Sequence, residues 1–179
     1  MGRRTQPSMR ELSKLINAWD DVENHPEQVS KAMERAVNKY PDFAAGWGHL
    51  GLAYMQSGRA KDAESALLKA SSLEPQSAGW YLALSTLYKL AVANTKGLVG
   101  RVERIRVLAE AGVELAPECA AMLPDYVSKI TLEALDCDYA YARRMAERYA
   151  KDVLNLTKEK EFTSSAVNNL LDIQMADGI

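Results

Sequence analysis

Cysteine and histidine are scarce in this sequence of 179 residues, and their scarcity excludes several kinds of site. The two cysteines, Cys119 and Cys137, form no C-x-x-C pair, which excludes a zinc ribbon and a thioredoxin-type redox pair. With only two histidines, His25 and His49, we expect no metal site. We interpret both cysteines as buried thiols in a reducing compartment.

The sequence also lacks an excess of one charge and any long apolar run. Lys and Arg total 22 against 24 Asp and Glu, so the net charge is −2, and binding to nucleic acid or to an anionic membrane is not expected. The longest apolar stretch, residues 78–95, is interrupted by Ser85, Thr86 and Lys89, and no secretory signal opens the chain. The hydrophobic content of 47% suits one globular domain, which we expect to be cytoplasmic.

No arrangement of residues typical of an enzyme is present. The tight carboxylate pairs, Asp20 with Asp21 and Asp136 with Asp138, fall at predicted helix ends, where aspartate commonly caps a helix. No serine lies in a G-x-S-x-G motif, and the run K-G-L-V-G at 96–100 matches neither a phosphate-binding loop nor a dinucleotide fingerprint. We therefore predict a protein that is not an enzyme and that holds no cofactor.

A repeat signature occupies residues 44–77. Its fixed positions follow the pattern W-x2-L-G-x2-Y and continue with small residues and a proline on a second segment: Trp47, Leu50, Gly51, Tyr54, Ala63, Leu67, Ala70 and Pro75. The segment resembles the tetratricopeptide repeat family, whose 34-residue unit is a helix-turn-helix. The resemblance implies an all-α protein, in which about nine helices stack in antiparallel pairs into a right-handed superhelix.

The residues of this segment favour the same architecture on physical grounds. Trp47, Leu50 and Tyr54 are spaced three and four apart, which places them on one face of a helix. Gly51 lies among them, where a side chain would hold the two helices apart, so we expect Gly51→Leu to be severely destabilising. Gly58, which follows a serine, supplies the turn between the helices.

The same periodicity predicts one domain, 1–179, made of successive units. These are a flexible N-terminus at 1–8, a degenerate repeat at 9–43, the full repeat at 44–77, a repeat with an insertion at 78–117, a divergent helix pair at 118–157 and a capping helix at 163–179. The first helix should run from Met9 to Asp20, and the divergent pair should form helices at 119–135 and 139–156.

The insertion changes the spacing of the units. Pro75 and Pro117, which end successive units, are 42 residues apart rather than 34, which leaves an insertion of eight. It falls near residues 91–100, between the two helices of its repeat. Gly97 and Gly100 favour a loop that follows a lengthened first helix.

The resemblance also implies a site, because the first helices of successive tetratricopeptide repeats line a concave groove that holds a peptide. By the family register the groove is lined here by Ala45, Gly48, His49, Leu52, Met55, Leu82, Thr86 and Lys89. Family members that grip an acidic chaperone tail use several Lys, Arg and Asn side chains, whereas this set has one Lys, and His49 replaces an Asn. We therefore expect an apolar helix or extended peptide as partner, and a Leu52→Glu/Met55→Glu double variant that folds but does not bind.

We favour a non-catalytic adaptor or scaffold module, and three alternatives remain open. The groove can be covered by the protein's own terminal helix or by a second copy, and the chain is then a self-associating structural subunit. His49 either contacts the ligand or is a partly exposed helix residue. A basic cluster either binds an acidic partner or is a solvated helix face, and it consists of Arg101, Arg104 and Arg106.

Overall fold

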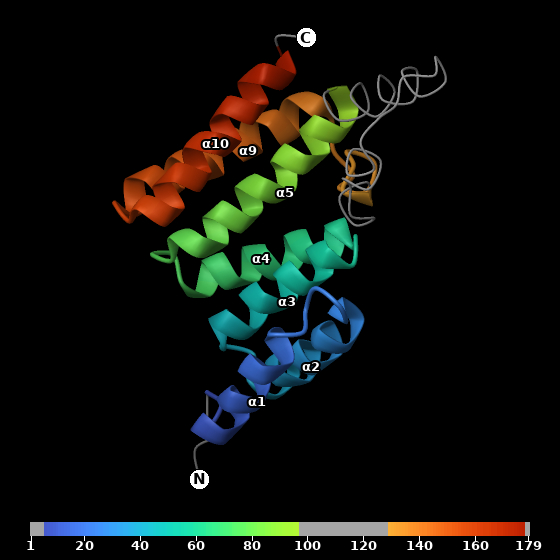
Figure 1. Cartoon of the computed structure of the whole chain (residues 1–179), viewed down its shortest axis with the longest axis vertical. Coiled ribbons are helices and arrows are strands. Elements are labelled where there is room, and N and C mark those ends of the chain that lie inside the picture. Colours follow the sequence, from blue (N-terminus) through green and yellow to red (C-terminus); the bar gives the residue numbers. More distant parts are fainter. Residues whose placement is uncertain (1–5, 97–128, 178–179) are drawn as a thin grey trace, which may run out of the picture.

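The computed structural model describes residues 6–96 and 129–177, and every regular element in these two ranges is a helix. The seven helices are α1 (Met9–Trp19), α2 (Pro26–Lys39), α3 (Ala44–Gln56), α4 (Ala60–Leu73), α5 (Ala78–Lys96), α9 (Tyr139–Leu156) and α10 (Lys160–Asp177). They follow one another along the long axis, with the two termini at opposite ends (Figure 1). The all-α class is confirmed, while the count of nine helices and the right-handed superhelix stay predictions.

Helices α3 and α4 form the hairpin that the repeat signature predicts. Gly58 lies in the turn between them with φ +73°, a left-handed conformation that favours glycine. Gly51 lies where the two helices cross, because a Cβ atom there would be 2.6 Å from Cγ of Leu67 and 3.3 Å from the carbonyl oxygen of Ala63. The sequence pattern therefore located both the turn and the close approach.

The helices before this hairpin begin where their local signals predict. Ser8 caps α1 and forms a capping box with Glu11, in which each side chain accepts a hydrogen bond from the other residue's backbone N–H. Pro26 occupies the first turn of α2, where its missing N–H costs no hydrogen bond. Helix α2 packs on α3, and α1 lies against α2 at the N-terminal end (Figure 1).

Helix α5 confirms the prediction of a lengthened first helix. It has 19 residues, against 13 in α3, so part of the insertion extends the helix. The loop predicted at Gly97 and Gly100 lies outside the described residues, as does the partner helix expected near Arg101. The next described segment, from residue 129 onward, leads into α9 and α10, which both pack on α5 (Figure 1).

The helix predicted at 119–135 does not reach its expected end. Residues 130–138 are not helical, 132–136 form turns, and Asp136 has φ +52°. Asn94 donates to the Ile130 oxygen at 2.5 Å, which a helix through residue 135 would use for its own hydrogen bond, and Lys61 donates to the Leu135 oxygen at 3.1 Å. These distant donors compete with the helix, and the local pattern of apolar residues does not reveal them.

The last two described helices, α9 and α10, begin at or near the residues predicted from the sequence. Asp138 caps α9 as predicted, because its Oδ1 accepts a hydrogen bond from the Tyr141 backbone N–H at 2.7 Å. Helix α10 begins at Lys160, three residues before the expected start of the capping helix at 163. The earlier start brings Phe162 into the helix and into the apolar cluster that joins α10 to its neighbours.

A buried hydrogen-bond network fixes α10 on α5 and α9. Ser85 of α5 donates to the Ala146 carbonyl oxygen of α9 at 2.8 Å. Asn169 of α10 donates to the Ser85 hydroxyl at 3.2 Å and to the Thr86 hydroxyl at 3.1 Å. Ser85 and Asn169 are both buried, so this network specifies how the three helices meet.

Candidate functional site

Helix α10 occupies the part of the predicted groove that α5 was expected to provide. Thr86 accepts a hydrogen bond from Asn169, and Lys89 forms a 3.2 Å ion pair with Asp172. Leu82 packs in an apolar cluster that includes Phe162 and other side chains of α10. The terminal helix α10 therefore covers Leu82, Thr86 and Lys89, as one of the alternatives from the sequence had it.

Two of the groove residues predicted on α3 lie inside the protein instead. Met55 is 7% exposed and belongs to the main core cluster. Gly48 lies directly under the Trp80 ring, which would overlap with any Cβ atom at this position. Helix α3 has no Asp, Glu, Lys or Arg, and six of its 13 residues are glycine or alanine, so α2, α4 and α5 can pack against it from several sides. The Leu52→Glu/Met55→Glu double variant is therefore not expected to fold normally, which corrects the prediction from the sequence.

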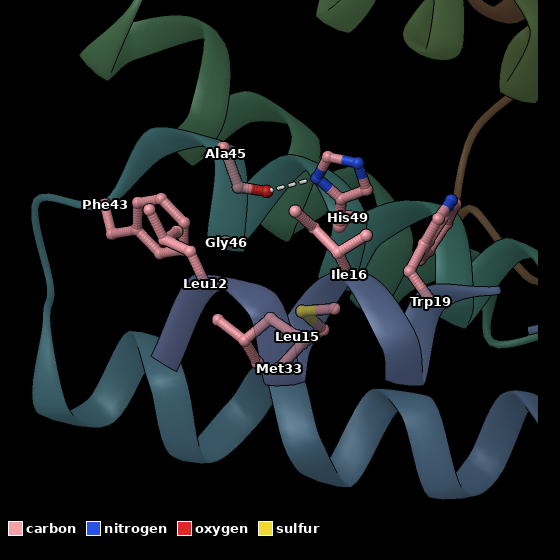
Figure 2. Close-up of a pocket in the computed structure, with 9 residues that line it drawn as sticks. All are labelled: Leu12, Leu15, Ile16, Trp19, Met33, Phe43, Ala45, Gly46 and His49. Atoms are coloured by element: carbon pink, nitrogen blue, oxygen red, sulfur yellow. Dashed lines mark hydrogen bonds between the residues drawn. The ribbon is translucent and has the colours of Figure 1, made fainter. Parts of the chain in front are cut away.

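An open apolar pocket remains between α1 and α3, at the end of the groove that α10 does not reach (Figure 2). Its volume is about 240 Å³. It is lined by Leu12, Leu15, Ile16, Trp19, Met33, Phe43, Ala45, Gly46 and His49. We call it the α1–α3 pocket.

The sequence predicted only Ala45 and His49 of this lining. The missed wall is α1, whose apolar residues Leu12, Ile16 and Trp19 recur at intervals of four and three. That spacing is the signal that could have found it, because it places three large apolar side chains on one face of a short helix. The family register assigned no groove position to this degenerate unit, so the wall was overlooked.

His49 is held in one orientation at the rim of the pocket. Its Nδ1 lies 2.7 Å from the Ala45 carbonyl oxygen and must carry the proton, since a carbonyl oxygen only accepts (Figure 2). Edge-to-face contacts place its ring 4.7 Å from the Trp19 ring and 5.7 Å from the Trp80 ring, measured between centroids. One ring each from α1, α3 and α5 thus forms a continuous aromatic row beside the pocket.

The Nε2 atom of His49 is the polar group that this row offers to a ligand. It has no hydrogen-bond partner within the described ranges. In the neutral tautomer it accepts a hydrogen bond. Leu52, one turn further along α3, is half-buried and extends the apolar surface. The site therefore combines an apolar floor with one acceptor of fixed direction.

A single carboxylate holds the α1 wall in place. Glu11 accepts hydrogen bonds from Lys39 Nζ at 2.5 Å, from the Tyr40 hydroxyl at 2.9 Å and from the Ser8 backbone and hydroxyl. These donors, Lys39 first among them, hold the pKa of Glu11 well below its usual value of 4.5. The ionised form of Glu11 therefore ties α1 to the end of α2.

We expect the α1 wall to loosen in acid. Because the folded pKa of Glu11 is lowered, its stabilisation is fully present above pH 4.5 and is lost as the pH falls toward the folded pKa. The indole N–H resonance of Trp19 should therefore move toward its random-coil position below pH 4.5, and in Glu11→Gln it should already be displaced at pH 7. An indole resonance that is the same in both proteins at pH 7 would contradict this assignment.

The carboxylate pairs and the described cysteine that the sequence singled out do not line the α1–α3 pocket. Within the described parts of the chain, no group of three or more His, Cys, Asp or Glu side chains is placed to hold a metal ion. Asp21 pairs with His25 at 2.7 Å rather than capping a helix. Cys137 is a half-buried free thiol, and burial raises its pKa.

Other predictions lie outside the described residues, namely those for Cys119 and for the basic cluster of Arg101, Arg104 and Arg106. Among the helices that are described, none has the length and apolar character needed to cross a membrane.

Comparison with models of known protein families, with curated proteins and with solved structures finds no match to this chain. Its place in the tetratricopeptide family therefore stays a prediction from the repeat signature.

Proposed function

We propose that this chain is a non-catalytic adaptor that binds an apolar segment of a partner protein in the α1–α3 pocket. The observation that carries the proposal is the exposure of Ile16. This apolar side chain lines the pocket and is 61% accessible to solvent. An isoleucine so placed gains free energy when a partner covers it, since burial of apolar surface drives most protein association.

The size of the pocket favours a peptide over a metabolite. A volume of about 240 Å³ is smaller than the roughly 300–1,000 Å³ of small-molecule sites. It suits one anchoring side chain of a helix or an extended peptide, with the rest of the peptide lying over the aromatic row. No charged side chain lines the pocket, which supports an apolar anchor rather than an acidic tail.

The test is a pair of matched substitutions. A short peptide selected by display for binding to the wild-type protein should bind Ile16→Glu at least about tenfold more weakly, because the introduced carboxylate must lose water when the anchor docks. Leu68→Glu is the control, since Leu68 is 41% exposed on α4 and lines no pocket described here. Equal affinities for the wild type and Ile16→Glu, measured by titration calorimetry, would rule out the pocket as the site.

A second candidate function, self-association, is favoured by one observation on α10. Val167, Leu171 and Met175 are 43%, 50% and 56% exposed and recur every four residues, so they form an apolar stripe on the outer face of the helix. A second copy that covered this stripe would make the chain a structural subunit. Sedimentation equilibrium over a concentration series decides the question, because a monomer at every concentration contradicts this candidate.

A further inference from the structure

Helix α9 exposes a row of cations that the sequence analysis did not single out. Arg144, Arg148 and Lys151 are all exposed and lie at positions i, i+4 and i+7, hence on one face of the helix over about 10 Å. None of the three forms an ion pair within the part of the chain that the structure describes. They line a shallow surface hollow of about 440 Å³. We call this row the α9 basic ridge.

Two of these cations are partly ordered before any partner arrives. The Arg144 guanidinium carbon lies 6.0 Å from the centroid of the Tyr141 ring, and that of Arg148 lies 5.9 Å from the centroid of the Tyr149 ring. Ordering on an aromatic ring lowers the entropy that each long side chain loses on binding. The neighbouring Arg143, by contrast, is paired with Glu147 at 3.1 Å.

We propose that the α9 basic ridge binds an acidic helix of a protein partner, with carboxylates spaced one turn apart. Arginine pairs well with carboxylates through its fork of N–H donors, and one-turn spacing on the partner matches the spacing of Arg144 and Arg148. Glu147 and Asp152 line the same hollow and would repel the evenly charged backbone of a nucleic acid. A protein helix can place its separated carboxylates next to the arginines and away from Glu147 and Asp152.

The ridge is separate from the pocket of the proposed function. Helix α1 lies near the N-terminal end of the molecule, and α9 lies near the opposite end (Figure 1). Ile16→Glu should therefore leave binding at the ridge unchanged, and changes at the ridge should leave binding in the pocket unchanged.

The experiment uses a fluorescein-labelled helical peptide of about 20 residues that carries glutamates one turn apart, and its glutamine counterpart. Fluorescence anisotropy with the full chain should show binding of the glutamate peptide that weakens as salt is raised, and no binding of the glutamine peptide. Arg144→Glu/Arg148→Glu should weaken binding at least about tenfold, and Arg144→Gln/Arg148→Gln should give an intermediate loss.

The matched control is Lys31→Glu/Arg35→Glu, which reverses two exposed cations at the same i, i+4 spacing on α2. It should change the affinity less than about twofold, because it alters the net charge equally but leaves the ridge intact. The proposal is overturned if the control weakens binding as much as the ridge variant, or if the wild type does not bind the glutamate peptide. Tighter binding of a single-stranded oligonucleotide of equal charge would also overturn it, because it would assign the ridge to nucleic acid.

Discussion

Replacing Gly51 with leucine is expected to lower the free energy of unfolding by about 3 kcal/mol, at the upper end of the range for overpacked cores. A Cβ atom at this position would already be 2.6 Å from Cγ of Leu67, and the rest of a leucine has no space between α3 and α4. The two helices would have to separate, which opens the core between α3 and α4. Thermal unfolding followed by circular dichroism should show the midpoint lowered by about 6–12 °C.

Gly79 provides a matched control for the effect of adding a side chain to a helical glycine. A Cβ atom there would make only an ordinary contact, 3.8 Å from Cε1 of Phe162. Gly79→Ala should therefore leave stability unchanged or raise it by up to about 1 kcal/mol, because alanine favours the helix. Gly51→Ala should destabilise. If Gly51→Leu melted at the wild-type temperature, the helix crossing described here would be wrong.

Replacing Met55 with glutamate is expected to destabilise the fold by at least about 3 kcal/mol. The carboxylate would be buried in the main core cluster without a partner, and burial of an unpaired charge is among the most damaging of substitutions. Leu52→Glu is the matched control, because Leu52 is half-buried and its glutamate can reach water. We expect the control to cost less than about 1 kcal/mol.

Urea unfolding of the two single variants measures both values. It also separates the two residues that the sequence register had grouped as lining of one groove. Equally small losses of stability, below about 1 kcal/mol, in Met55→Glu and Leu52→Glu would show that both side chains face solvent, and the groove predicted from the sequence would then be restored.

The features that the sequence predicted correctly are governed by nearby residues. The cap of α9 follows from Asp138, and the hairpin turn follows from Gly58. The crossing at Gly51 joins α3 to α4, the next helix along the chain. Such signals act within one helix end or within one hairpin of consecutive helices, so a single sequence is enough to interpret them.

The features that the sequence did not predict depend on contacts between distant segments. Asn169 reaches Ser85 and Thr86 from more than 80 residues away, and that contact places α10 over the part of the predicted groove that lies on α5. Asn94 likewise binds the Ile130 carbonyl oxygen and ends a helix that the local pattern continued. The periodicity of a helix shows which face is apolar, but it does not show which other helix will cover that face.

The α1–α3 pocket was missed for a related reason. The predicted register places groove residues on the first helix of each well-formed repeat, and the sequence analysis assigned α1 to a degenerate repeat. Its wall forms because Glu11 binds Lys39 and Tyr40, which brings Ile16 and Trp19 to the edge of α3. Nothing in the spacing of Glu11 predicts partners almost 30 residues away.

Nuclear magnetic resonance can locate the bound peptide and so test whether an apolar segment of a partner binds in the α1–α3 pocket. The display-selected peptide would be titrated into the isotopically labelled protein. We predict that the largest shift changes occur at Ile16, at the Trp19 indole and at His49. Changes that are largest along the exposed stripe of α10, with the resonances of α1 unmoved, would contradict the claim and move the binding site to the C-terminal helix.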